Sequence, residues 1–188
     1  MCGSLMNKEK VKKLFEYARE SIKATFHNHK FKPEKVPAGL KEERGVFVTL
    51  TLNEQLRGCI GSTSQAPVWK SVITNARSSA FSDPRFQPLR EEEFQKVIIE
   101  LSLLSEPEET SLKDIKEGDG VIINQGLFSA LFLPQVWEQL PSKEQFLSHL
   151  CTKAGLSPDC YTERETVFKK FKVEAWKEKT PGGSITRV

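Results

Sequence analysis

A polar turn between two apolar segments is the feature that most constrains this fold. Residues 45–52 (GVFVTLTL) are rich in β-branched and aromatic side chains, and residues 53–55 (NEQ) separate them from residues 56–62 (LRGCIGS). Such segments on either side of a short polar turn are typical of two paired strands. We therefore predict an antiparallel β-hairpin whose second strand is interrupted by Gly58 and Gly61.

The second strand of this hairpin brings several functional residue types together. Side chains alternate along a strand, so Arg57 and Cys59 are expected on one face, about 6–7 Å apart. Gly58 and Gly61 remove side chains on both sides of Cys59, which lets backbone or a ligand approach closely. The strand therefore predicts a site, although by itself it names no reaction.

Other segments show helical or strand periodicity. Residues 7–26 repeat apolar side chains at three- and four-residue steps, which predicts an amphipathic helix capped by Asn7. A second helix is expected to begin at Pro67, so the Cys59 strand would lead to a helix N-terminus, where an anion is favoured. The remaining predicted elements are a strand, a second hairpin, a helix and a late strand, at residues 96–104, 121–133, 142–154 and 171–176.

The late strand is expected to pair back into the sheet formed by the earlier strands. With 188 residues the chain can form one large domain or two small lobes, and we expect a single domain over residues 1–188. The polar residues 180–188 are expected to form a loose tail. Two interpretations of residues 1–6 stay open: non-native residues before a start at Met6, or a disordered terminus.

Composition excludes several classes of protein. The 28 basic and 25 acidic residues give a net charge of +3, whereas nucleic-acid binders usually carry a strongly basic patch, so we expect no nucleic-acid partner. No apolar run reaches the roughly 20 residues that cross a bilayer, and the N-terminus lacks the apolar stretch of a signal peptide. We therefore expect a cytoplasmic protein with no membrane partner.

The cysteines and histidines form no recognisable metal-binding or disulfide pattern. The chain has four cysteines, none of which lies in a CxxC pair: Cys2, Cys59, Cys151 and Cys160. The three histidines show no recurring ligand spacing. We expect reduced thiols, no metal and no cofactor.

Cys59 is the candidate nucleophile. The thiolate is the reactive form, and a nearby cation or helix N-terminus favours it. Arg57 would supply the first and the helix after Pro67 the second. The alternative is that Cys59 is a small buried apolar residue, because cysteine is among the most buried residue types.

Arg57 and Arg85 are candidates for binding an anionic substrate through bidentate hydrogen bonds. Either could instead form a structural ion pair with Asp83, which precedes Pro84 and is first of all a turn residue. As a further substrate-binding candidate, Asp83 would act as a general base. The remaining candidates are strand residues that leave room for a ligand or offer a hydroxyl group: Gly58, Gly61 and Ser62.

Four segments resemble those of a known family: residues 56–61 (LRGCIG), 79–88 (SAFSDPRFQP), 131–136 (LFLPQV) and 153–156 (KAGL). On these segments the chain resembles the AMMECR domain family, from about residue 11 to residue 176. The resemblance implies an α+β fold with two unequal lobes around an antiparallel sheet. It also implies similarity to protein A of the AmmeMemoRadiSam system, and so a Memo-like protein and a radical SAM protein as candidate partners.

Two functional hypotheses follow. The first is a thiol-dependent enzyme, or enzyme component, of a modification pathway, with a cleft around Cys59 that binds a small or peptide-borne anionic substrate. The second is a non-catalytic module that binds Memo-like and radical SAM partner proteins, because no recognisable acid–base pair accompanies the cysteine.

Overall fold

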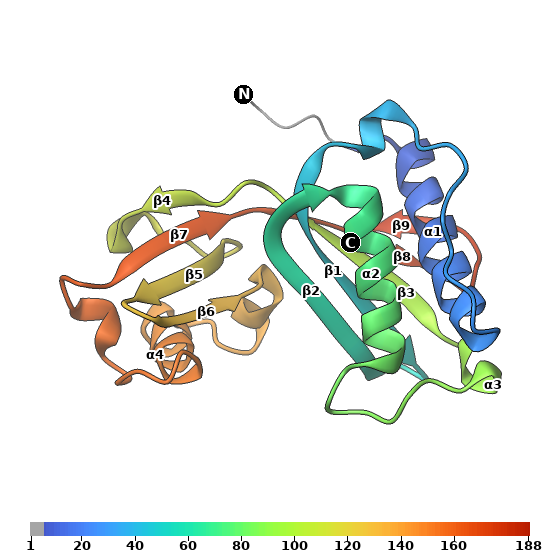
Figure 1. Ribbon diagram of the computed structural model, residues 1–188. Helices are drawn as coiled ribbons and strands as arrows, with labels where there is room; N and C mark the ends of the chain where they lie inside the picture. Colours follow the sequence, from blue (N-terminus) through green and yellow to red (C-terminus); the bar gives the residue numbers. More distant parts are fainter. Residues whose placement is uncertain (1–5) are drawn as a thin grey trace. The chain divides into compact units, whose positions relative to one another are not determined.

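The computed structural model describes residues 6–188, which divide into two compact units (Figure 1). The first unit comprises the described residues up to Leu104 together with Glu174–Val188, and the second is Ser105–Val173. Each unit has its own antiparallel sheet, helices and hydrophobic core. The predicted α+β class is confirmed.

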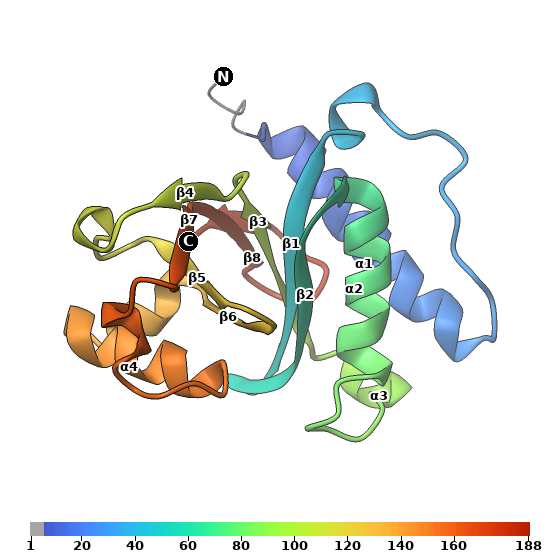
Figure 2. The ribbon, with the colours of Figure 1, turned by 60° about the vertical axis from the view of Figure 1, so that its left-hand side comes forward.

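The first unit is built on a five-stranded sheet in the order β2-β1-β3-β8-β9. Its strands are β1 (Glu43–Leu52), β2 (Gln55–Pro67), β3 (Ile98–Leu104), β8 (Val173–Glu178) and β9 (Ile185–Arg187). Its helices are α1 (Lys8–Phe26), α2 (Val68–Phe81) and the single turn α3 (Glu91–Phe94), with a 3-10 turn η1 (Ala38–Leu40) before β1. Figure 2 shows α1 and α2 together on one side of β1 and β2.

The β1–β2 hairpin follows from its turn residues. Asn53 and Glu54 both have positive φ angles, 50° and 64°, as a two-residue type I′ turn requires. The turn pairs Leu52 with Gln55, and a register shift further along the hairpin brings Thr49 opposite Cys59. The predicted hairpin is confirmed, although β2 runs on to Pro67 and α2 begins only at Val68.

Alternation along the strands sorts the sheet residues into two faces. Every second residue of β1 and β3 is buried in the core shared with α1 and α2: Val46, Val48, Leu50, Ile99, Leu101 and Leu103. The residues between them, which include Thr49 and Glu100, point to the opposite face. Cys59 lies on this second face because it pairs with Thr49.

The start of α1 agrees with the prediction. The Asn7 side chain accepts a hydrogen bond from the Lys10 backbone N–H at 2.9 Å and caps the helix. Met6 packs in the core of the first unit, with 4% of its surface exposed. The interpretations offered for residues 1–5 lie outside the described residues.

The second unit has a four-stranded sheet in the order β4-β7-β5-β6. Its elements are β4 (Glu108–Thr110), η2 (Leu112–Asp114), β5 (Gly120–Gln125), β6 (Phe128–Phe132), η3 (Pro134–Glu138), α4 (Lys143–Lys153), η4 (Cys160–Thr162) and β7 (Val167–Phe171). In its core the Trp137 ring stacks on Phe146, with 4.0 Å between the ring centroids. The predicted second hairpin is β5–β6, and the predicted helix with a Ser142 cap is α4.

Two expectations for the C-terminal part of the chain differ from the structure. The predicted late strand is two strands, β7 and β8, which belong to different sheets. Residues 185–187, expected in a loose tail, form β9, in which Arg187 pairs with Trp176 of β8. Backbone pairing with β8 orders this short polar segment, and polarity alone did not reveal that partner.

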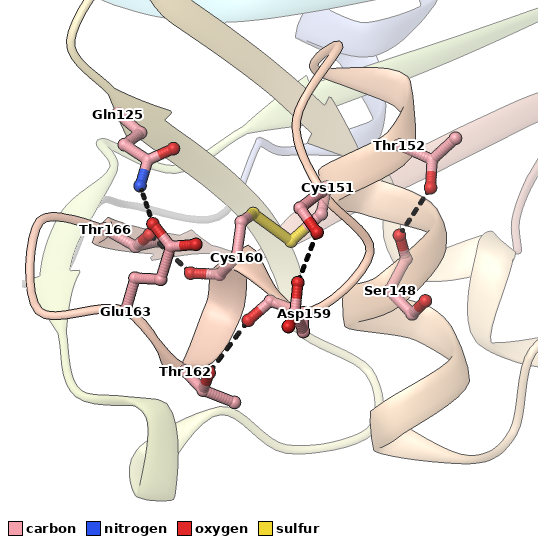
Figure 3. The surroundings of a disulfide bond; sticks show 10 residues. Gln125, Ser148, Cys151, Thr152, Asp159, Cys160, Thr162, Glu163 and Thr166 are labelled. Carbon is pink, nitrogen blue, oxygen red and sulfur yellow. Dashed lines mark hydrogen bonds between the residues drawn. A yellow bond between two sulfur atoms is a disulfide. The ribbon is translucent and has the colours of Figure 1, made fainter.

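The prediction of reduced thiols is wrong for Cys151 and Cys160, which form a disulfide (Figure 3). The chain turns back after α4 at Gly155, whose φ is +81°. This reversal brings the two Cα atoms to 6.0 Å, within the usual range for a disulfide. Cys59 is the free cysteine within residues 6–188, and Cys2 lies outside the described residues.

Reduction of this disulfide should lower the free energy of unfolding. The bond closes a loop of about ten residues, and its effect on the entropy of the unfolded chain corresponds to roughly 2–3 kcal/mol. Urea unfolding with and without dithiothreitol measures the difference. The reductant should have no effect on a Cys151→Ala/Cys160→Ala variant, and equal stability of the unaltered protein in both conditions would contradict the prediction.

Candidate functional site

The Cys59 side chain is half-buried on the face of the sheet that points away from α1 and α2. The hydroxyl of Thr49, directly opposite on β1, donates a hydrogen bond to Cys59 Sγ at 3.3 Å. The alternative of a cysteine sealed in the apolar core does not hold, because Cys59 belongs to neither of the two buried clusters.

Asp83 and Arg85 hold the backbone of Cys59 at its N–H and at its carbonyl. Asp83, buried in the loop after α2, accepts a hydrogen bond from the Cys59 N–H at 2.8 Å. The Arg85 guanidinium binds both carboxylate oxygens of Asp83, at 3.0 and 2.7 Å, and Nη2 also donates to the Cys59 carbonyl at 3.3 Å. We call this arrangement of Asp83, Arg85 and the Cys59 backbone the clamp.

The electrostatics of the clamp keep Asp83 ionised. Hydrogen bonds from the Arg85 side chain hold the pKa of the Asp83 carboxyl well below its usual range, against the opposing effect of burial. The same pair raises the pKa of Arg85. An ionised Asp83 serves as a hydrogen-bond acceptor, so the alternative of a structural ion pair with Arg85 is the one observed.

The glycines of β2 permit close packing within the first unit. A Cβ atom at Gly58 would lie 2.1 Å from the backbone carbonyl oxygen of Ser79 in α2. A Cβ atom at Gly61 would lie 2.2 Å from the ring of Phe47. Ser79 also accepts a hydrogen bond from the Ile60 N–H at 2.8 Å. The space that the two glycines leave is therefore occupied by Ser79 and Phe47 of the same unit and not by a ligand.

The alternation that predicted Arg57 beside Cys59 is interrupted at Arg57. The β1–β2 register shifts at this point, with Leu50 opposite Gly58 and Thr51 opposite Leu56, so Arg57 is an extra residue in a β-bulge. A bulge breaks the alternation on which the prediction depended.

The partner of Arg57 is Glu93 in α3. Nε and Nη2 of Arg57 donate to the two oxygens of Glu93 at 3.1 and 3.0 Å. These hydrogen bonds are the main reason that the pKa of Glu93 is lowered to about 2. Sequence reasoning missed Glu93 because it lies 36 residues from Arg57, and the alternative partner Asp83 is bound by Arg85 instead.

The expected helix N-terminus is not at Cys59. The part of α2 that contacts Gly58 and Ile60 is Ser79, near the C-terminal end of the helix. The first helical residue, Val68, donates its N–H to the Glu42 carbonyl. Ser62, the remaining predicted site residue, is exposed, and its hydroxyl accepts a hydrogen bond from the Ser64 N–H.

Glu100 joins the site and was missed by sequence reasoning. It lies opposite Thr49 on β3, so Cys59, Thr49 and Glu100 form a row across three strands. Burial raises the pKa of the Glu100 carboxyl, and Lys177 of β8 acts in the opposite direction. A single charged residue in the otherwise apolar and hydroxyl-bearing strand β3 was the available signal.

The described residues hold no further feature that competes with this site. Residues 6–188 bring together no cluster of three or more His, Cys, Asp or Glu side chains that could hold a metal ion. Every helix in the described part of the chain is too short or too polar to cross a membrane. A pocket of about 230 Å³ in the first unit is lined by residues distant from Cys59 in sequence, among them Arg19, Lys23, Phe94 and Gly182.

The sequence model of the AMMECR1 family matches residues 15–176. The chain belongs to this family. Protein SSO0193 of Saccharolobus solfataricus is 40% identical, across 95% of this chain and 86% of that protein. Protein PYRAB00100 of Pyrococcus abyssi is 40% identical across 82% of each. The crystal structure of uncharacterized protein PH0010 from Pyrococcus horikoshii has a TM-score of 0.89 at 36% identity, covering 97% of this chain and 98% of that one.

In this AMMECR1-family chain, the four segments that carried the resemblance meet in pairs, one pair in each unit. Residues 56–61 and 79–88 meet at the clamp in the first unit. Residues 131–136 and 153–156 meet in the second unit, where Lys153 Nζ donates to the Leu131 carbonyl at 2.9 Å. Only the first pair surrounds a free thiol within the described chain.

The two ion pairs of the site should make the protein sensitive to acid. Because the folded-state pKa values of Asp83 and Glu93 lie below their ordinary values of 3.8 and 4.5, the unfolded chain binds more protons as the pH falls through this range. Stability is therefore fully present above about pH 5 and decreases toward pH 2.

Thermal unfolding between pH 7 and pH 3 measures this effect. An Arg57→Met variant, in which Glu93 loses its main partner, should show a smaller difference in Tm between the two pH values. Arg164→Met, an exposed arginine of the second unit, serves as the control. An undiminished difference in Arg57→Met would contradict the role assigned to the Glu93 pair.

Proposed function

We propose that this chain is a thiol-dependent enzyme, or the thiol-bearing component of one, that acts on a small or peptide-borne anionic substrate within a modification pathway. One observation carries the proposal: Cys59 presents a half-exposed thiol on a backbone that the clamp holds at both its N–H and its carbonyl. A nucleophile held by rigid elements and hydrogen bonds loses little freedom when a substrate binds.

The exposed side chain of Arg85 is the reason for proposing an anionic substrate. Its side chain is 53% exposed, and within residues 6–188 its Nη1 group makes no hydrogen bond, because Nε and Nη2 make those of the clamp. Two N–H donors therefore remain for a carboxylate or phosphate group. Arg57 offers much less, because its side chain is 14% exposed and bound to Glu93. We therefore assign the binding of the anionic group to Arg85 and no longer to Arg57 and Arg85 together.

The second candidate function is the non-catalytic module for Memo-like and radical SAM partner proteins. It is favoured by the closed ion pairs, since Asp83, Glu93 and Arg57 all have structural roles and none is free to act in catalysis. The cytoplasmic location is also a proposal. The buried disulfide between Cys151 and Cys160 counts against this location, because such bonds persist mainly in oxidising compartments.

Alkylation of the native protein tests the first function. Iodoacetamide at pH 7 should modify Cys59 at least as fast as it modifies glutathione, and mass spectrometry locates the label. Cys151 and Cys160 should stay unlabelled until the protein is reduced. A Cys59 that reacts only after unfolding would overturn the thiol function and favour the binding module.

A second comparison tests Arg85. Iodoacetate is anionic and iodoacetamide is neutral, so the ratio of their rates at Cys59 reports the local charge. Loss of one positive charge about 5 Å away changes this ratio by about fourfold in water. Arg85→Gln should lower the ratio by this factor, whereas Arg57→Gln, the same change in charge, should leave it unchanged. Equal ratios in the two variants would remove Arg85 from the anion site.

A further inference from the structure

The row of Cys59, Thr49 and Glu100 crosses β2, β1 and β3 on the face of the sheet away from α1 and α2. Residues opposite each other in antiparallel strands have Cα atoms about 4.5–5.5 Å apart, so Cys59 and Glu100 are about 10 Å apart with Thr49 between them. All three side chains are half-buried, whereas Ser102, further along β3 on the same face, is 2% exposed. The row is therefore accessible but not freely solvated.

Glu100 differs from the other acids that are buried or half-buried in the first unit. Those acids are each paired with an arginine: Glu42, Asp83, Glu93, Glu174 and Glu178. No arginine pairs with Glu100, and within residues 6–188 its carboxyl accepts no hydrogen bond. The structure gives this group no role in holding the scaffold. A carboxyl that is partly dehydrated and unpaired is typical of a functional acid or base.

The surroundings of Glu100 suit proton transfer. The titratable groups that this face of the sheet presents to it are Lys177 from β8 and Cys59 from β2, with the Thr49 hydroxyl between Glu100 and the thiol. Burial favours the protonated carboxyl, and Lys177 attracts the carboxylate. Both protonation states are therefore supported, as an acid–base residue requires.

We propose that Glu100 is the acid–base residue of the Cys59 site, and that the substrate is an electrophile whose addition to the thiol needs a proton, such as a carbonyl compound or a conjugated alkene. This proposal rests on the proposed thiol function. The Cys59 thiol loses its proton to solvent, and the thiolate adds to the electrophilic carbon and forms an S–C bond. The π electron pair moves to the far atom, which takes the proton of Glu100. Glu100 is left as a carboxylate beside Lys177 and accepts the proton back when the adduct is released.

Two probes separate this role from the reactivity of the thiol itself. The reaction of a thiolate with iodoacetamide needs no proton transfer, because the thiolate displaces iodide, which leaves as an anion. Acrylamide adds to a thiolate and then needs a proton on carbon. General acids typically accelerate such steps by 10²–10⁴-fold, and we expect at least about a tenfold effect on a probe that is not the substrate.

At pH 7, Glu100→Gln should therefore lower the ratio of the acrylamide rate to the iodoacetamide rate at Cys59 about tenfold or more. Glu100→Asp should restore part of the ratio. Glu92→Gln, an exposed acid of α3, is the matched control and should leave it unchanged. An unchanged ratio in Glu100→Gln, with rapid labelling by iodoacetamide, would overturn the role of Glu100 and leave the thiol function intact. Failure of iodoacetamide to label the native protein would overturn the thiol function and this inference with it.

Infrared spectroscopy tests Glu100 without any probe. The C=O stretch of a protonated carboxyl, taken as the difference between the unaltered protein and Glu100→Gln, should persist above the pH at which an ordinary glutamate loses its proton, about 4.3. A band that titrates at the ordinary value would contradict the proposal even where the alkylation rates agree with it.

Discussion

The hydrogen bonds of the buried Asp83 carboxylate join the two segments on which the site depends. β2 is an edge strand of the five-stranded sheet, so its outer backbone groups have no neighbouring strand to bind. Inside the sheet, the Ser79 hydroxyl bridges β2 to β1, because it accepts the Ile60 N–H and donates to the Val48 carbonyl. At the outer edge, Asp83 accepts the Cys59 N–H and Arg85 donates to the Cys59 carbonyl, so the loop after α2 replaces the missing strand at this residue. A position that would otherwise be free to pair with another chain is closed by side chains.

Most residues of the hexapeptide at residues 56–61 therefore have a structural role. Gly58 is needed because the Ser79 carbonyl lies where its Cβ would be, and Gly61 because the Phe47 ring does. Arg57 sits in the bulge and anchors α3 through Glu93. Cys59 is different, because its backbone is held by the clamp while its thiol, within residues 6–188, has one hydrogen bond, from the Thr49 hydroxyl. A rigid main chain with an uncommitted thiol is the arrangement that a nucleophile needs and that a packing residue does not.

The parts of the structure set by neighbouring residues could be predicted, and the parts set by distant ones could not. The hairpin turn at Asn53 and Glu54, the Asn7 cap and the polar–apolar alternation of β3 depend on local sequence. The pairing of Arg57 with Glu93 joins residues 36 apart, and Arg57 lies in a bulge that interrupts the alternation of β2. The disulfide depended on a chain reversal at Gly155 that brings Cys160 back to α4. Periodicity contains no information on either contact, because each depends on how separate elements pack.

Three acids of one unit show how packing, and not residue type, assigns their roles. Asp83 and Glu93 each accept paired hydrogen bonds from a guanidinium, which stabilises the carboxylate and keeps it charged at neutral pH. Within residues 6–188, Glu100 has no such partner, so burial raises its pKa, and Lys177 acts in the opposite direction. The first two acids therefore act as fixed acceptors that hold the strand and α3. The third, in register with the thiol, is the carboxyl in the row whose proton can move when a substrate occupies the open face of the sheet.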